Sequence, residues 1–223
     1  MSKRAMTDEA KALKAQAILD QAAEMFYSSD YEQIKMSDIA KEMKMSKGIL
    51  FVYFKTKESL FFNLLCREYE KRLNRLIEII LKSRIRDFDD FKHLLLTELS
   101  KLVEHNSLYI RLEAMRTTVL EKNVDAETML MLKMNLYVQM RRMTTLICEH
   151  NALTETEVMD VFQAEASIIT GCKLNATLPP EVVDIIEKQG LEGLKRDFKQ
   201  DVLTTMQSYL EGYRAIHRNA AKD

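Results

Sequence analysis

The sequence predicts an all-α protein, on the basis of its turn-forming residues and the spacing of its apolar residues. The 223 residues include only five glycines and two prolines, while 47% of them are hydrophobic. So few turn formers argue against a sandwich or barrel of many short strands. Apolar residues recur every three or four positions along most of the chain, as they do in a helix that buries one face. We therefore expect long helices joined by few loops.

The limits of the expected helices follow from this spacing and from residues that start or stop a helix. Ser46 and Thr56 each precede a helical run and can cap it by accepting a backbone N–H bond. Thr154 and Glu157 can form a capping box, and the Pro179-Pro180 pair is expected to break the chain. Helices are accordingly predicted over residues 8–28, 37–43, 46–53, 57–82, 88–105, 108–121, 126–150, 155–176 and 191–217.

Residues 35–57 combine two short predicted helices, a tight turn at Lys44 and Met45, and a local positive charge. This stretch holds six lysines and two acidic residues, a net charge of +4, whereas the whole chain carries −1. Two short helices with lysines and a tyrosine on and just after the second have the form of a helix-turn-helix that reads the DNA major groove. The next predicted helix follows this head without a helix breaker, so any shift of that helix would be felt by the head.

Cysteine, histidine and glycine patterns argue against several other classes of protein. The three cysteines are widely spaced without a CxxC pair, which disfavours disulfides and zinc and favours a reducing cytoplasm. The four histidines show no metal-ligand spacing, and no GxSxG, GxGxxG or P-loop occurs. The first residues contain no apolar run typical of a signal peptide, and no apolar stretch reaches membrane-spanning length. We expect no catalytic residues, no metal, no cofactor, no membrane partner and a cytoplasmic location.

The middle of the chain is rich in methionine, which accounts for fourteen residues of the whole sequence. Methionine adapts to irregular apolar shapes, so a cavity for a hydrophobic ligand is one interpretation. Ordinary core packing is the other, and it is the more common use of any single methionine. The candidate ligand-binding residues are Tyr109, Met115, Met131, Met134, Tyr137 and Phe162.

The head also carries motifs at fixed positions over one continuous span, namely Ile18, Ala22, Phe26, Tyr31, Asp38-Ile39-Ala40, Ser46-Lys47-Gly48, Phe51 to Phe54, Lys57-Glu58 and Leu60. These motifs resemble the N-terminal domain of the TetR family of transcriptional regulators, over about the first 60 residues. The resemblance implies a helix-turn-helix DNA-binding domain over residues 1–56 and a larger helical ligand-binding and dimerisation domain over residues 57–223. It also implies DNA contacts from Met45, Lys47, Gly48, Ile49, Phe51, Val52, Tyr53 and Lys57.

Physical chemistry adds roles for other residues of the head. Ser46 and the free N–H groups beside it can face a phosphate, and Gly48 lets the backbone approach the DNA closely. Ile39, Ala40, Leu50 and Phe54 are expected to hold the three helices together.

The chain departs from the family pattern at three positions. Lys35 stands where a capping Thr is usual, and we expect it to contact phosphate instead. Asp30 replaces a Gly, just after the first helix where a left-handed residue often sits, and Phe51 replaces a Tyr. Ile49 and Val52 offer apolar contacts to thymine methyl groups, so we expect recognition to depend on these contacts and on DNA shape.

The resemblance further implies a homodimer formed through the helices near 155–176 and 191–217, and a repressor that binds a palindromic double-stranded DNA operator. A small hydrophobic effector would enter a cavity between the helix over 57–82 and those over 108–121, 126–150 and 155–176. Two other classes remain open at this point. One is a regulator of the same fold that is controlled by a protein partner, and the other is a helical enzyme or scaffold without a DNA role.

Overall fold

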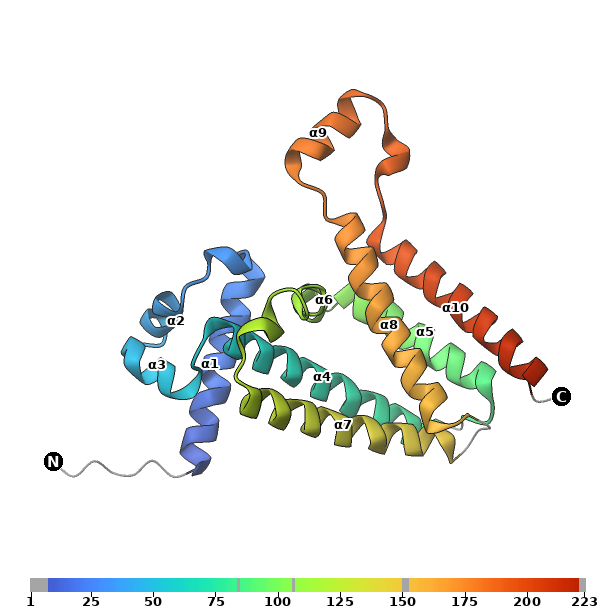
Figure 1. The fold of residues 1–223 in the computed structure, drawn as a ribbon, viewed down its shortest axis with the longest axis horizontal. Coiled ribbons are helices and arrows are strands. Elements are labelled where there is room, and N and C mark those ends of the chain that lie inside the picture. Colours follow the sequence, from blue (N-terminus) through green and yellow to red (C-terminus); the bar gives the residue numbers. More distant parts are fainter. Residues whose placement is uncertain (1–7, 84, 106, 150–152, 221–223) are drawn as a thin grey trace. The chain divides into compact units, whose positions relative to one another are not determined.

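The computed structural model describes residues 8–83, 85–105, 107–149 and 153–220, with side chains described as far as Ala215. Every regular element among these residues is a helix, so the predicted all-α class is confirmed (Figure 1). The α-helices are α1 (Asp8–Ser28), α2 (Met36–Glu42), α3 (Lys47–Tyr53), α4 (Lys57–Lys82), α5 (Phe88–His105), α6 (Ser107–Met115), α7 (Ala126–Cys148), α8 (Glu155–Ala176), α9 (Pro180–Lys188) and α10 (Phe198–Ala220). Short 3-10 helices are η1 (Tyr31–Gln33), η2 (Leu120–Asn123) and η3 (Glu192–Leu194).

The chain divides into two compact units, and the division does not follow a single point in the sequence. We call the first the head unit; it comprises the residues up to Glu68 together with Met115–Met134. The second, which we call the C-terminal unit, comprises Tyr69–Ala114 together with the residues from Asn135 onward. The helices α4, α6 and α7 each contribute residues to both units. The predicted domain boundary after residue 56 stays a prediction.

The head unit is held together by a small apolar core between its first helices. Ile18 and Ala22 of α1, Ile39 of α2 and Leu50 of α3 are fully buried. Helix α2 packs against both α1 and α3 (Figure 1). The Phe61 ring of α4 meets the rings of Phe26 and Tyr31 edge to face, with centroids 5.3 and 5.1 Å apart. The expected packing roles of Ile39, Ala40, Leu50 and Phe54 are confirmed, since all four are buried.

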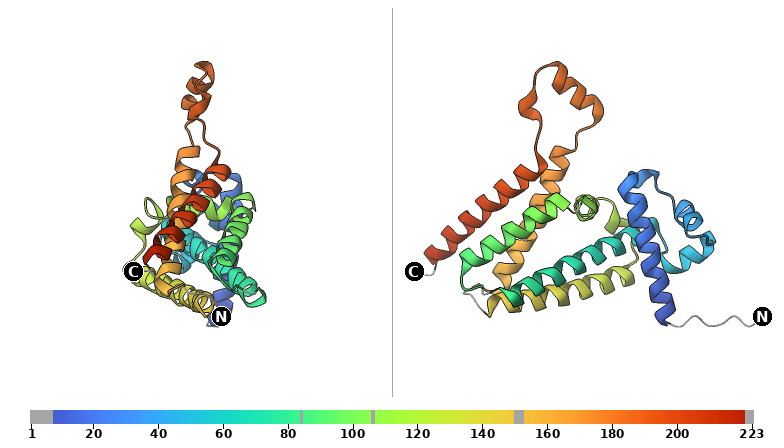
Figure 2. Two further views of the ribbon diagram at one scale, coloured as in Figure 1. Left: turned by 90° about the vertical axis from the view of Figure 1, so that its right-hand side faces the viewer. Right: turned by 180° about the vertical axis from the view of Figure 1, so that it is seen from behind.

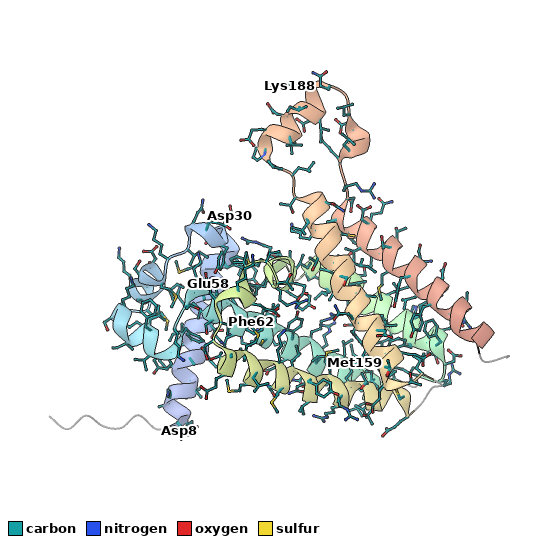
Figure 3. All side chains as sticks on the ribbon, viewed as in Figure 1. Asp8, Asp30, Glu58, Phe62, Met159 and Lys188 are labelled. Atoms are coloured by element: carbon teal, nitrogen blue, oxygen red, sulfur yellow. The ribbon has the colours of Figure 1, made fainter. Side chains whose placement is uncertain are left out.

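The C-terminal unit is built around α10, which packs against α8 and α5 (Figure 2). Its core draws apolar side chains from several helices, including Leu76, Phe91, Leu95, Val161, Ile169, Val202, Met206 and Leu210. Helix α9 stands beyond the ends of α8 and α10 in all views, with Lys188 near its far end (Figures 2 and 3).

Three segments differ from the sequence prediction. Helix α6 ends at Met115 instead of residue 121, and a turn leads into η2. The proline pair starts a helix instead of only breaking the chain, because Pro180 occupies the first position of α9, where its fixed φ suits a helix. Helix α10 begins at Phe198, seven residues later than predicted. Asp197 accepts the Gln200 N–H at 2.8 Å and so satisfies a donor at that start.

The left-handed residue expected at Asp30 is absent there, and a lysine in the helix-turn-helix turn adopts this conformation instead. Asp30, in the connection between α1 and α2 (Figure 3), has φ −79° and ψ 153°, which is extended backbone. Lys44 instead has a φ of 51°, in the left-handed region. Its neighbour Met45 donates its N–H to the Ala40 carbonyl at 2.9 Å, which closes the turn. A lysine in this conformation costs roughly 1 kcal/mol or more relative to glycine.

Lys44→Gly should therefore raise the free energy of unfolding by about 0.5–1 kcal/mol, because glycine adopts positive φ without a steric penalty. Urea denaturation followed by circular dichroism measures the change. Lys41→Gly is the matched control, since Lys41 is an exposed lysine inside α2. The control should destabilise by about 0.5–1 kcal/mol. Equal effects of the two substitutions would contradict the strain assigned to Lys44.

Candidate nucleic-acid interface and buried polar cluster

The reading helix α3 begins at a capped position. The Ser46 side-chain oxygen accepts the Ile49 N–H at 3.3 Å, which confirms the predicted cap. Leu50 is fully buried and anchors the helix to the head unit. The side chains on either side of Leu50 consequently point away from the core.

The outward face of α3 is apolar. Ile49, Phe51 and Val52 are 49%, 37% and 70% exposed. The Lys47 ammonium lies 5.6 Å from the centre of the Phe51 ring, which places a cation beside this apolar surface. Such a face has no use in packing the head unit, and it is available to a partner.

Gly48 is not required by the packing of the chain itself. A Cβ added there would have the Ser46 hydroxyl oxygen at 4.0 Å as its nearest neighbour, which is an ordinary contact distance. Its backbone φ is also outside the left-handed region. The absence of a side chain therefore opens the outer surface of α3, as a closely approaching partner would need.

The other predicted DNA contacts lie at the start of α2, in the turn before α3 and at the end of α3. Lys35 occupies the N-cap position of α2, is exposed, and makes no side-chain capping bond. Ser46 is also exposed, while Met45 and Tyr53 are half-buried. The DNA contacts assigned to all of these residues stay predictions.

Lys57 lies in a different environment from Lys47. Its ammonium donates to the Tyr31 carbonyl and, at 2.8 Å, to the Ile34 carbonyl. It also lies 3.8 Å from the centre of the Tyr31 ring. Burial lowers the pKa of Lys57, and the nearby Glu32 and Glu58 carboxylates oppose this effect. Lys57 thus ties the start of α4 to the loop before α2, a role that the sequence did not predict.

A second connection in the head unit comes from residues 120–125, which follow the early end of α6. Leu120 is fully buried. Thr56 donates its hydroxyl to the Asn123 carbonyl at 3.1 Å while accepting the Ser59 N–H at 2.9 Å, which confirms the predicted cap of α4. Lys55 and Asp125 form an ion pair at 3.5 Å. The short link between α3 and α4 is therefore braced by a segment from the middle of the chain.

The C-terminal unit contains a buried ion pair between α4 and α8. Arg72 donates to both carboxylate oxygens of Glu165, at 2.7 and 2.6 Å, and Glu165 is only 1% exposed. The Arg72 guanidinium also donates to the Tyr109 hydroxyl at 3.2 Å and lies 5.5 and 6.0 Å from the Tyr109 and Phe162 ring centres. Burial lowers the pKa of Arg72, but Glu165 more than offsets this, so that the net pKa is raised.

A second buried carboxylate extends this cluster. The Tyr69 hydroxyl donates to Glu113, which is buried on α6. The rings of Tyr69 and Tyr109 pack edge to face with centroids 5.5 Å apart. Burial raises the pKa of the Tyr109 hydroxyl, which therefore stays protonated. We call Tyr69, Arg72, Tyr109, Glu113 and Glu165, with the Phe162 ring, the buried polar cluster.

The structure brings together only part of the predicted ligand-binding set. Tyr109 and Phe162 flank Arg72 in the buried polar cluster. Met115, at the end of α6, is half-buried. Met131, Met134 and Tyr137 differ from the interior placement that we expected, since each is more than half exposed on α7. Ligand contacts by these six predicted residues stay a prediction.

Sequence reasoning missed Arg72 and Glu165. Each belongs to a helix whose neighbouring apolar positions face the core, such as Phe162 and Ile169 around Glu165. The signal in the sequence that could have identified them is a charged residue at a helical position where the spacing predicts a core-facing apolar residue. Helix α7, by contrast, buries Met143, Thr144 and Ile147 and turns its other side outward.

The described residues also limit other kinds of site. No group of three or more histidine, cysteine or acidic side chains within the described ranges is placed to hold a metal ion. Likewise, none of the described helices has both the length and the apolar character needed to cross a bilayer.

A capped helix-turn-helix with an outward reading face, followed by a helical unit with its own core, defines the class of helix-turn-helix transcriptional regulators. The chain belongs to the TetR family of bacterial regulatory proteins. The family's DNA-binding model, described as "Bacterial regulatory proteins, tetR family", matches residues 18–64. A second model, described as "Tetracyclin repressor-like, C-terminal domain", matches residues 67–217. Membership places the chain among transcriptional regulators and not among enzymes, and it confirms the predicted family.

Individual relatives are similar over different extents. An uncharacterised HTH-type transcriptional regulator of Bacillus subtilis, YuxN, is 35% identical over 66 residues, which are 30% of this chain and 23% of that protein. Among solved structures, the fatty acid degradation regulator FadR of Bacillus halodurans has a TM-score of 0.55 at 15% identity, over 88% of this chain and 94% of its own. FadR of Bacillus subtilis in complex with stearoyl-CoA has a TM-score of 0.46 at 17% identity, over 88% and 95% of the two chains. The likeness to FadR of Bacillus halodurans supports the fold.

Lys47 at the start of the reading helix and Lys57 at the start of α4 should respond differently to removal of their charge. Lys57→Met should lower the free energy of unfolding by about 1–3 kcal/mol, because the Tyr31 and Ile34 carbonyls each lose the Lys57 ammonium as a donor. Lys47→Met should change stability by less than about 0.5 kcal/mol. It should also reduce the slope of log affinity against log salt for duplex DNA by about 0.9, as one lost phosphate contact would. Urea denaturation and fluorescence titrations at several salt concentrations measure both quantities. An unchanged unfolding free energy in Lys57→Met would contradict its bracing role.

Proposed function

We propose that this chain is a cytoplasmic, ligand-responsive repressor that binds a palindromic DNA operator as a homodimer and is released by a small hydrophobic effector. The observation that supports the DNA-binding part is the outward apolar face of α3, with Lys47 beside it. The family to which the chain belongs supports the regulatory part.

The chemistry of α3 favours a particular way of reading DNA. Ile49 and Val52 are the exposed side chains that can reach thymine methyl groups, and neither can hydrogen-bond to a base edge. Lys47, Lys35 and the Tyr53 hydroxyl would contact phosphates, which position the helix without reading sequence. Gly48 would allow the sugar-phosphate backbone to approach α3. Recognition would thus combine a few thymine contacts with DNA shape.

A dimer would supply the second reading helix. We propose that α8 and α10, which pack together within one copy, pair with α8 and α10 of a second copy. The two copies of α3 would then enter successive major grooves, about 34 Å apart, and the operator would be a palindrome.

The buried polar cluster supports the effector part of the proposal. Replacing a buried ion pair by apolar side chains is often neutral or stabilising, so Arg72 and Glu165 are not needed merely to fill a core. Tyr109 and Phe162 place aromatic surface beside these charges. A molecule with an apolar body and one polar end fits this combination. Its binding would displace α4, whose first turns belong to the head unit.

Selection from a pool of random duplexes tests the DNA-binding proposal. The wild-type protein should enrich palindromes with thymines at matching positions of the two half-sites. Ile49→Ala and Val52→Ala should each weaken binding to the selected operator by about 1 kcal/mol, or roughly fivefold, and relax selection at those thymines. Leu13→Ala is the matched control, because Leu13 is an exposed apolar residue of α1. It should leave operator affinity and the selected sequence unchanged. Unaltered selection in both α3 variants would refute thymine reading, and the absence of any enriched sequence would refute operator binding.

Reciprocal binding measurements test the effector proposal. Mass spectrometry of the natively purified protein would identify a retained small molecule, which is then titrated by calorimetry with and without the selected operator. Operator should weaken the molecule's affinity by the same factor by which the molecule weakens operator affinity. Tyr109→Phe should lower the molecule's affinity by about 1 kcal/mol if the hydroxyl binds it, whereas Tyr27→Phe on the surface of α1 should not. An affinity that is independent of operator would end this part of the proposal.

A further inference from the structure

Helix α7 carries an exposed apolar stripe, which consists of Leu130, Met131, Met134, Tyr137 and Val138. These side chains are between 56% and 65% exposed. Because α7 is one uninterrupted helix from Ala126 to Cys148, their spacing along the sequence places them on one side of it. Single exposed apolar residues are common on protein surfaces, but a contiguous group marks an interaction site. The stripe is therefore a candidate interaction site.

The order of side chains in the stripe is symmetric about Met134. Leu130 and Val138 lie four residues on either side of Met134, and Met131 and Tyr137 lie three residues on either side. The symmetry continues to the charged residues at the ends, Glu127 and Arg141, each seven residues from Met134. Both ends are exposed, and they carry opposite charges. An identical helix running in the opposite direction would thus meet a matching sequence of side chains.

We propose that the α7 stripe is an interface with a second copy of this chain, in which two α7 helices pack antiparallel about a two-fold axis next to Met134. In this arrangement Leu130 of each copy lies opposite Val138 of the other, and Met131 lies opposite Tyr137. Glu127 of each copy lies opposite Arg141 of the other, so that an ion pair closes each end. A patch that is complementary to itself is what a two-fold interface requires.

The charges select the antiparallel direction. A parallel pair would place Glu127 against Glu127 and Arg141 against Arg141, and like charges across an interface are unfavourable. Arg141 already pairs with Glu155 of its own chain at 3.0 Å, but its side chain remains 55% exposed. A guanidinium has five N–H donors, so Arg141 can also accommodate the carboxylate of the second copy.

The size of the stripe sets the expected strength of association. Five large apolar side chains that are about 60% exposed would remove roughly 500–600 Å² of surface per copy, or about 1,000–1,200 Å² in total, which is at the low end for a specific interface. We therefore expect reversible association, with a dissociation constant on the order of micromolar. The stripe lies on a different helix from α8 and α10. If those helices form a dimer, the stripe would join two dimers.

Analytical ultracentrifugation of the full chain without DNA tests the interface. The probe is Met134→Asp, which places two like charges together at the two-fold axis. At the same concentration its assembly should have half the mass of the wild-type assembly, whether the change is from dimer to monomer or from tetramer to dimer. Leu81→Asp is the matched control, because Leu81 is 64% exposed on α4 and lies off the stripe. This control should keep the wild-type mass, and circular dichroism should show both variants folded.

Exchange of the end charges tests the antiparallel direction. Glu127→Arg and Arg141→Glu should each weaken self-association about tenfold or more, because each puts like charges together at both ends of the pair. A mixture of the two variants should associate as the wild type does, since every end then joins an arginine to a glutamate. In a parallel arrangement neither variant alone would weaken self-association, because like charges already meet at both ends of the wild-type pair, and the mixture would associate more tightly than the wild type.

Three results would overturn the proposal. The first is an equal mass for the wild type and Met134→Asp at every concentration up to about 100 µM. The second is an equal loss of mass in Leu81→Asp, which would mean that any added surface charge has this effect. The third is a mixture of the two charge variants that associates no better than either variant alone. None of these results involves DNA binding, so they bear on the α7 stripe independently of the proposed repressor function.

Discussion

The start of α4 is the point on which the arrangement of the head unit depends. Only three residues separate the end of α3 from α4, so the orientation of the reading helix is set where α4 begins. Thr56 caps α4 and also bonds the Asn123 carbonyl, while the Lys57 ammonium reaches the Tyr31 and Ile34 carbonyls. These bonds tie the start of α4 to the loop before α2 and to the segment after α6. A shift in either α4 or residues 120–125 would therefore reach α3 directly.

The C-terminal unit is stabilised by apolar packing, but its charged groups impose a separate constraint. Loss of one partner of the Arg72 and Glu165 pair would leave a buried charge uncompensated, at a cost of about 3–5 kcal/mol. The pair joins α4 to α8, and Tyr109 adds α6 through its hydroxyl. The three helices are thereby held in one relative position by bonds with strict geometry, whereas apolar contacts alone would tolerate sliding. A ligand that competes for any of these polar groups would act on all three helices.

Much of the fold could be predicted from the sequence, because local signals determine most helix limits. Ser46, Thr56 and Thr154 cap as expected, since a cap depends only on neighbouring backbone groups. The misplaced elements are those where local signals compete. Pro180 could either end or begin a helix, and it begins α9. Leu191 has the apolar spacing of α10, but the helix starts later, where Asp197 accepts the Gln200 N–H. Lys44 could not be identified as left-handed, because a lysine, unlike glycine or asparagine, has no local preference for that conformation.

The candidate sites were harder to predict, because helical spacing shows that residues share a face but not which way the face points. Met131, Met134 and Tyr137 were predicted to line a ligand cavity, yet the side of α7 that carries them is exposed. Burial of Met143 and Ile147 on the other side of α7 determines the direction, and this burial depends on residues distant in sequence. The adaptable side chain of methionine suits a ligand cavity and a protein interface equally well. What separates the two uses here is the symmetric placement of Glu127 and Arg141 about Met134. A small ligand has no need of charges seven residues away on both sides, whereas two antiparallel helices bring both ends into contact.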